Sequence, residues 1–180
     1  MTGPKKHWNY FMRSLKVRKF IIGKIAFLSG FAIDAHLGCL AKNHKDVDIM
    51  ISKDEAKELA KYLTNLGHSV YEVEKYKGEI LKVDQADPEK ETQAHCDIHF
   101  FWEENGKVII PLSGKKLIFS NVFDEITEEL SFLGENIKVL KPQYLKEEKQ
   151  GWIDQIGLIP SEERMKEYDA DMDKISALMK

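Results

Sequence analysis

Asp46 and Asp48 are two carboxylates separated by a single apolar residue. They alternate with Val47, Ile49 and Ile51, a pattern typical of a β-strand with one polar and one apolar face, so both carboxylates should lie on the same face. Like charges a few ångströms apart repel each other unless a cation lies between them or solvent screens them. Mg²⁺ prefers oxygen ligands, usually one or two carboxylates with substrate phosphates and water. The pair therefore predicts a divalent-cation site.

A third aspartate, Asp97, lies in a second alternating segment at 94–101, which also has the pattern of a strand. If the two strands are neighbours, the three carboxylates can hold two metal ions. One ion would bind a triphosphate, and the other would lower the pKa of an attacking hydroxyl. Ser29 and Gly30, at a predicted strand-to-helix turn, would bring backbone N–H groups and a hydroxyl to the phosphates. The joint pattern favours a metal-dependent enzyme that uses a nucleoside triphosphate.

Zinc is an alternative reading of His95, Cys96 and His99. On a strand, however, the two histidines share the face of Asp97 while the cysteine points to the other face, so one tetrahedral site would need distortion. We expect instead that the histidines flank the carboxylate site, where they contact substrate or orient Asp97, or that they lie at exposed or core-edge positions.

The elements that must position these residues follow from hydrophobic periodicity. The pattern predicts helices at 7–19, 31–40, 53–66, 142–151 and 161–179. The predicted strands are 21–28, 47–52, 69–73, 79–83, 94–101, 107–112 and 137–140. The helix at 7–19 is amphipathic, and we expect it to lie on the core, with membrane or nucleic-acid contact as the alternative.

Length and composition indicate one globular domain. The 180 residues form one domain in this interpretation, with a core at about 20–140, the N-terminal helix at 7–19 and C-terminal helices within 142–179. A net charge of −3 argues against a surface built to bind nucleic acid, so no stable nucleic-acid partner is expected. Two cysteines are too few for a disulfide scaffold and favour a reduced cytoplasmic setting. The most apolar stretch, 20–33, is shorter than the roughly 20 residues that span a bilayer, and no membrane partner or cleavable signal peptide is expected.

Two segments carry a resemblance to a known family. Residues 29–34, Ser-Gly-Phe-Ala-Ile-Asp, and residues 44–49, His-Lys-Asp-Val-Asp-Ile, resemble the signature of the small lincosamide and aminoglycoside nucleotidyltransferases, within the polymerase-beta-like superfamily. Residues 96–100 resemble the later strand that carries the family's third acid. The likeness covers about 25–152, with a weaker tail motif at 140–144 and 151–152.

The resemblance implies an α+β nucleotidyltransferase fold, in which helices flank a mixed β-sheet, with N-terminal and C-terminal helices added. It also implies dependence on Mg²⁺ or Mn²⁺. The implied enzyme transfers a nucleoside monophosphate, most simply AMP from ATP, to a hydroxyl of a small-molecule acceptor, for which an antibiotic is one candidate. In-line attack on the α-phosphorus would release pyrophosphate, with catalysis by positioning and charge neutralisation.

The same resemblance implies roles for individual residues. Asp46 and Asp48 would bridge the metal ions, and Asp97 would be a further metal ligand and the general base. Ser29 and Gly30 would hold the β- and γ-phosphates. These five residues, together with Lys42, form the expected catalytic and nucleotide-binding set.

The chain departs from the family at two places. Ser29 stands where the superfamily usually has a glycine, and Ala41-Lys42 stands where the antibiotic-modifying relatives tend to carry Thr-Arg. Lys42 would offset developing charge on the nucleotide, because lysine keeps the positive charge while it loses the bidentate fork of arginine.

Other polar residues have two readings. His44 is expected to stabilise a turn, with catalysis as the alternative, and Asp34 is either a helix-surface charge or a partner to a nearby base. The last helix carries ordinary solvated charges, or charges that close a nucleotide cleft, at Lys166, Asp169 and Asp173.

The sequence is also compatible with two further functions. One is a protein-modifying minimal nucleotidyltransferase of the antitoxin type, and the other is a non-catalytic nucleotide-binding module. The three acids argue against the second, because a binding module has little reason to concentrate repulsive carboxylates. A homodimer is plausible, since a chain of this length offers few walls for an acceptor cleft.

Overall fold

The computed structural model describes residues 23–41, 44, 46–65, 67–72, 80–85, 94–112, 114–157 and 159–180. The helix predicted at 7–19, and Lys42, lie outside these residues. Within them the chain forms helices α2 (Ser29–Leu37), α3 (Lys53–Asn65), α4 (Phe123–Ile126), α5 (Pro142–Asp154) and α6 (Glu162–Leu178). Its strands are β1 (Ile25–Phe27), β2 (Asp46–Ser52), β3 (Ser69–Glu72), β4 (Ile80–Gln85), β5 (Ala94–Glu104), β6 (Lys107–Leu112), β7 (Lys115–Phe119), β8 (Thr127–Phe132) and β9 (Glu135–Leu140).

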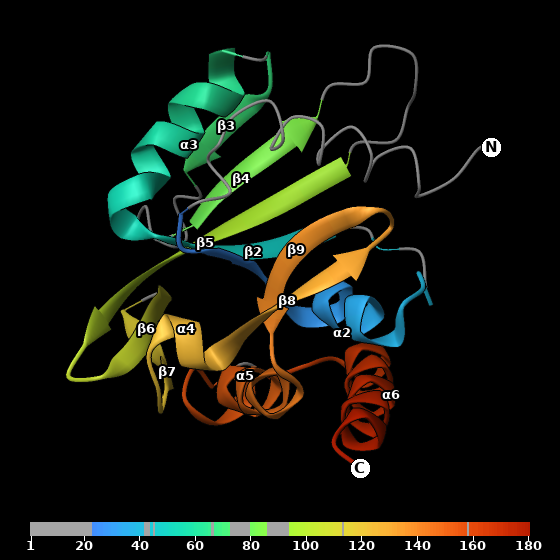
Figure 1. Ribbon diagram of the computed structural model, residues 1–180. Helices are drawn as coiled ribbons and strands as arrows, with labels where there is room; N and C mark the ends of the chain where they lie inside the picture. The colour runs from blue at the N-terminus through green and yellow to red at the C-terminus, as the bar shows by residue number, and fades with distance from the viewer. Residues whose placement is uncertain are drawn as a thin grey trace.

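The strands of the described residues form one mixed sheet in the order β3-β4-β5-β2-β1-β9-β8. Strands β2 and β5 run parallel, as do β1 and β9, while the other neighbours are antiparallel. The end of β5 continues into a second set of pairings with β6, which pairs in turn with β7. Figure 1 shows α3 beside β3 and β4, whereas α2, α5 and α6 are grouped together elsewhere. The predicted α+β architecture with a mixed sheet is confirmed.

The core is built from the apolar faces of these elements. On α3 the buried residues Ala56, Leu59, Tyr62 and Leu63 recur every three or four positions, which is the spacing of one helix face. On β2 the residues Ile49 to Ile51 are all buried, as expected for a central strand covered on both sides. Because β2 and β5 lie in the middle of the sheet, the residues that they carry are held rigidly.

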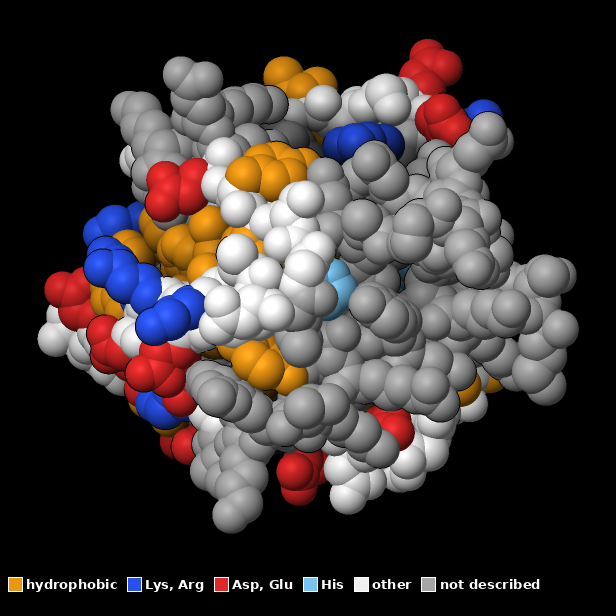
Figure 2. Space-filling view, turned by 90° about the horizontal axis from the view of Figure 1, so that it is seen from above, with side chains coloured by type: hydrophobic (Ala, Val, Ile, Leu, Met, Phe, Trp, Pro, Cys, Tyr) orange, Lys and Arg blue, Asp and Glu red, His pale blue; other side chains and the backbone are white. Residues whose placement is uncertain are grey.

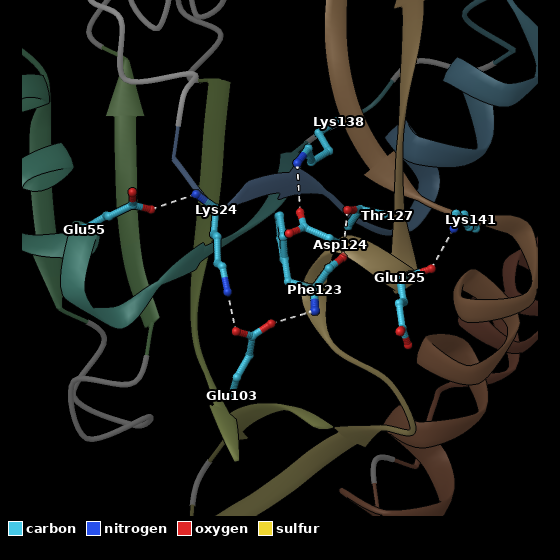
Figure 3. A network of polar contacts seen from close by, with 9 residues as sticks. All are labelled: Lys24, Glu55, Glu103, Phe123, Asp124, Glu125, Thr127, Lys138 and Lys141. Atoms are coloured by element: carbon cyan, nitrogen blue, oxygen red, sulfur yellow. Dashed lines mark hydrogen bonds and ion pairs between the residues drawn. The ribbon is translucent and has the colours of Figure 1, made fainter. Parts of the chain in front are cut away.

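A polar network ties the start of β1 to three other elements (Figure 3). The backbone N–H of Lys24 donates to Glu55 of α3 at 2.9 Å, and its side chain pairs with Glu103 at the end of β5. Glu103 also accepts a hydrogen bond from the Phe123 N–H at 2.8 Å, at the start of α4. The hydrogen bond from Lys24 lowers the pKa of Glu103, so the carboxylate remains ionised.

The structure differs from the predicted elements in several places. Strands β7 and β8 were not predicted. The sequence of β8 is acid-rich, which hid the strand, although Thr127 and Phe132 at its ends are buried. Helix α2 begins at Ser29 rather than at residue 31 and ends at Leu37, where Gly38 adopts a left-handed backbone conformation, with φ of 71°. Strand β5 extends to Glu104, beyond the predicted end at 101.

On the face shown in Figure 2, acidic and basic side chains of the described residues lie intermixed, most densely at the left and again at the upper right, rather than in separate patches. The view gives no sign of a continuous basic surface among those residues. Among the helices of the described ranges, none has both the length and the apolarity needed to cross a bilayer.

Gly151 lies where α5 packs closely against β7. Helix α5 was predicted to stop near this glycine, but it continues to Asp154, and a Cβ built on Gly151 would overlap Leu117 Cδ1 of β7. The Gly151→Ala substitution should therefore lower the free energy of unfolding by about 1 kcal/mol, because overpacking outweighs the gain in helix propensity. Urea denaturation measures the change. The exposed neighbour Gln150→Ala should change stability by less than about 0.5 kcal/mol, and equal stability of the two variants would contradict the packing argument.

Candidate active site

The register of β2 and β5 brings the three predicted aspartates together. In this parallel pair, Asp48 lies opposite Asp97 and Asp46 lies opposite His95. Alternate residues of a strand share a face, so Asp46, Asp48, Asp97 and His99 all project from the same face of the sheet. The predicted adjacency of the two strands is confirmed, and it makes the carboxylates near neighbours.

The three carboxylates act on one another electrostatically. Asp46 is an exposed residue at the start of β2, yet its pKa is raised, first because the surrounding protein partly desolvates its charged form and then because the charges of Asp48 and Asp97 repel it. The pKa of the buried Cys96 thiol is raised well above its usual value, again by burial and by the three carboxylates. An ionised trio in this position therefore requires positive charge close by.

Lys82 supplies one such charge, from β4 on the other side of β5. Its register partner is Asp97, and its Nζ lies 3.2 Å from Asp97 Oδ1. Burial acts to lower the pKa of Lys82, but the hydrogen bond and the charge of Asp97 outweigh it, so the pKa is raised. A lysine ammonium therefore neutralises the carboxylate that was predicted to be the general base.

His99 lies against the second carboxylate. Its Nε2 is 3.5 Å from Asp48 Oδ1, and its side chain is buried. The indole ring of Trp152, on α5, packs against the imidazole with a centroid distance of 5.6 Å. This agrees with the prediction that His99 flanks the carboxylate site, whereas the side chain of His95 lies outside what the structure describes.

Lys149 of α5 is a second cation within electrostatic range of the site. Its Nζ lies 3.0 Å from Asp171 Oδ2 on α6, and its side chain is only 17% exposed. Burial acts to lower its pKa, but the charges of Glu148, Asp171 and Asp48 raise it. Lys149 therefore remains an ammonium ion within electrostatic range of the carboxylates.

The turn predicted to hold phosphate is made by Ser29, at the start of α2. This residue has a left-handed backbone, with φ of 52°, where a glycine would be less strained. Its N–H and its hydroxyl donate to the two oxygens of Glu148, at 3.0 and 2.5 Å. Both Ser29 donors are thus directed at an internal carboxylate, and phosphate binding by this turn remains a prediction.

Asp34 and His44 fix the segment that leads into β2. Asp34 is buried, and its Oδ2 accepts hydrogen bonds from His44 Nε2 at 2.7 Å and from the Ala41 N–H at 2.9 Å. His44 also packs edge-on against Phe31. The geometry agrees with the predicted turn-stabilising role of His44, and it makes Asp34 a partner to that residue rather than a surface charge.

Sequence reasoning missed Lys82, Lys149 and Glu148. No pattern in the sequence distinguishes them from solvated lysines and glutamates, because their partners come from other elements. The only local signal is the four-residue spacing of Glu148 and Trp152, which places both side chains on one face of α5. The charges predicted on the last helix are exposed at Lys166, Asp169 and Asp173, as expected for solvated positions.

The fit of a metal to this site rests on donor chemistry. Among the residues that the structure describes, no three His, Cys, Asp or Glu side chains are already arranged around a common ion. The zinc alternative gains no support from them. Three carboxylates on one face are nevertheless the donor set that Mg²⁺ or Mn²⁺ prefers. The metal site therefore stays a prediction, in which an ion would take over the neutralising role of Lys82.

Comparison with known proteins adds independent information. A family model described as aminoglycoside-2''-adenylyltransferase matches residues 15–155. A crystal structure of the lincosamide antibiotic adenylyltransferase LnuA with lincomycin bound has a TM-score of 0.67 and 12% identity, with 99% of each chain covered. A solution structure of the antibiotic-resistance factor ANT(2'')-Ia has a TM-score of 0.61 and 15% identity, covering 97% of this chain and 90% of that chain.

A crystal structure of ANT(2'')-Ia in complex with adenylyl-2''-tobramycin gives a TM-score of 0.58 and 14% identity, covering 96% of this chain and 94% of that chain. No curated protein sequence matches this chain. At these identities the solved structures speak for the fold, and they confirm the predicted nucleotidyltransferase fold.

The repulsion at Asp46 gives a pH-dependent prediction. Its carboxyl has an ordinary pKa of 3.8 when unfolded and a raised pKa when folded, so the stability that it contributes is present below 3.8 and is lost as the pH rises through the folded value. In the presence of a chelator, Asp46→Asn should therefore raise the melting temperature at pH 7, and the gain should shrink toward pH 4. Thermal denaturation at both pH values measures it.

Asp124→Asn is the control, because Asp124 is an exposed aspartate paired with Lys138 away from the trio. It should leave the melting temperature almost unchanged. A lower melting temperature of Asp46→Asn at pH 7 would show that the trio is not under repulsive strain.

Proposed function

We propose that this chain, which belongs to the aminoglycoside-2''-adenylyltransferase family, transfers AMP from ATP to a hydroxyl group of a small-molecule antibiotic. Family membership makes it an adenylyltransferase-like nucleotidyltransferase. The observation that carries the finer proposal is the register of β2 and β5, which sets Asp48 directly opposite Asp97 with Asp46 on the same face.

An antibiotic acceptor is supported by relatives that share the fold. One is a lincosamide antibiotic adenylyltransferase with lincomycin bound, and another is ANT(2'')-Ia in complex with adenylyl-2''-tobramycin. We infer from these relatives that the acceptor of this chain is likewise a small molecule, which would offer a free hydroxyl group. An assay with a panel of acceptors would identify the molecule that carries this hydroxyl.

Asp46, Asp48 and Asp97 would hold the divalent ion, Mg²⁺ or Mn²⁺. The ion would neutralise the triphosphate and lower the pKa of the acceptor hydroxyl. Asp97 is the proposed general base, because its carboxylate lies opposite Asp48 on the same face of the sheet and pairs with Lys82 at 3.2 Å. The side chain of Asp97 is 18% exposed although its Oδ1 is buried, so a bound acceptor would approach the part of the side chain that remains open.

The triphosphate would be held by the turn at the start of α2 and by Lys149. Both donors of Ser29 bind Glu148, so the phosphates would meet the backbone N–H groups that follow Ser29 from Gly30 onward, at a helix N-terminus that favours negative charge. The ammonium group of Lys149 lies within electrostatic range of Asp48. Its positive charge would attract the phosphates, which the divalent cation would neutralise only in part. Lys42, outside the described residues, remains a proposed additional cation.

A direct assay tests this function. The protein is incubated with ATP, Mg²⁺ and a panel of aminoglycosides, lincosamides and other hydroxyl compounds, and mass spectrometry detects an acceptor that has gained an adenylyl group. At least one acceptor should be modified, and Asp48→Asn should lower the rate by at least about 100-fold, because transition-state charge loses its neutralising ion.

Asp124→Asn serves as the matched control, since it removes a carboxylate of the same type from an exposed position outside the site. It should retain the wild-type rate. The proposal would fail if no acceptor gains an adenylyl group, or if transfer proceeds equally well after EDTA treatment and in the Asp48→Asn variant.

A further inference from the structure

Glu148 is a fully buried carboxylate that the proposed chemistry does not use. It lies on α5 and has no exposed surface. Its Oε2 accepts the N–H of Ser29 at 3.0 Å, and its Oε1 accepts the hydroxyl of Ser29 at 2.5 Å and the indole N–H of Trp152 at 3.1 Å. A single side chain therefore binds a turn far away in the sequence and a neighbour on its own helix.

Burying an ionised carboxylate is costly unless donors and positive charge surround it. Three donors meet that requirement here. The N-terminus of α2, a nine-residue helix, adds a favourable dipole, because Glu148 lies at its first residue. The adjacent Lys149 interacts favourably with the same charge. The arrangement is that of a built ionic contact rather than an incidental hydrogen bond.

The backbone of Ser29 supports this view. Its φ of 52° is a conformation that serine adopts less readily than glycine. The hydroxyl that distinguishes serine from glycine is the group that donates to Glu148 at 2.5 Å. The strain and the hydrogen bond occur at the same residue, so the hydrogen bond of the hydroxyl to Glu148 offsets the conformational strain of the Ser29 backbone.

The contact reaches the carboxylate site through Trp152. The indole that donates to Glu148 packs against His99 at a centroid distance of 5.6 Å, and His99 Nε2 lies 3.5 Å from Asp48 Oδ1. A continuous series of contacts therefore runs from Ser29 through Glu148, Trp152 and His99 to Asp48. Its two ends are the turn proposed to hold phosphate and a proposed metal ligand.

We propose that Glu148 is a positioning residue: its carboxylate sets the phosphate-binding turn of Ser29 at a fixed distance from the Asp48 carboxylate. This inference rests on the proposed function, and it adds a residue that does not touch the reacting atoms. Glu148 holds the Ser29 backbone in its left-handed conformation, which aims the amide groups that follow it at the start of α2. The same carboxylate orients Trp152, and Trp152 in turn packs the His99 ring beside Asp48.

The Glu148→Gln substitution tests the charge and the acceptor pattern without a change of size. An amide has one accepting oxygen, so its nitrogen must face either the Ser29 N–H or the two donors at the other oxygen. The turn should relax, and the KM for the triphosphate should rise about tenfold, as expected for the loss of a hydrogen bond to a charged group. The KM for the acceptor should change less than about twofold, which a general loss of stability would not produce.

Glu147→Gln is the matched control, because it makes the same change at the preceding residue of α5. Glu147 is only half-buried and lies outside the series of contacts that runs from Ser29 to Asp48. Its kinetic constants should equal those of the wild type. Indole N–H resonances provide a readout independent of activity: the signal assigned to Trp152 should shift in Glu148→Gln and should be unchanged in Glu147→Gln.

Ser29→Gly is the second variant, in case Glu148→Gln does not fold. It keeps the left-handed backbone, removes only the hydroxyl donor, and should also raise the KM for the triphosphate, by about threefold. If both variants fold, their combined effect should be smaller than the product of the single effects, because they remove the same contact.

The outcomes separate this inference from the function on which it rests. A wild-type protein that modifies acceptors, together with a folded Glu148→Gln or Ser29→Gly variant whose KM for the triphosphate is unchanged, would overturn the positioning role alone. A wild-type protein that transfers no nucleotide would overturn the proposed function, and the positioning role with it.

Discussion

The repulsion between three carboxylates on one face of the sheet is the constraint on which the rest of the site depends. It originates in the parallel register of β2 and β5, which places Asp48 opposite Asp97. The register is fixed by the core, because a shift of one residue would turn the buried Ile49 and Ile98 out of the apolar interior. The hydrophobic interior thus forces the carboxylates together, and their charges must be balanced by other means.

The surrounding elements supply that balance. Lys82 on β4 pairs with Asp97, and His99 on β5 lies beside Asp48. Lys149 on α5 pairs with Asp171 on α6 and lies within electrostatic range of Asp48. The two lysines come from different elements, so the packing of α5 and α6 is coupled to the electrostatics of the sheet. A divalent ion bound with a triphosphate would fit this pattern, because it brings positive charge to the same carboxylates.

The sequence was sufficient to predict the centre of the site but not its surroundings. Alternation in β2 and β5 indicated which side chains share a face, and that prediction needs only the geometry of a strand. Lys82 and Glu148 were not predictable, because their roles depend on residues 15 and 119 positions away along the chain. Gly151 suggested the end of a helix, but it lies within α5, where the close approach of Leu117 on β7 leaves no room for a side chain. Tertiary contacts determined what local patterns could not.

Membership of an antibiotic-modifying family agrees with this physical picture. A nucleotidyltransferase has to bring a triphosphate and an acceptor hydroxyl together against the repulsion of anionic groups, and concentrated carboxylates serve that purpose only with a bound cation. The family likeness and the register of two strands therefore support the same chemistry from independent observations.

Anomalous diffraction from a crystal grown with Mn²⁺ and a non-hydrolysable ATP analogue would show whether a cation holds the three carboxylates together. We expect a manganese peak beside the oxygens of Asp46, Asp48 and Asp97, with Lys82 displaced from Asp97 and the phosphates beside the turn of Ser29. A peak elsewhere, or a nucleotide bound while Lys82 still pairs with Asp97 and no ion lies between the carboxylates, would contradict it.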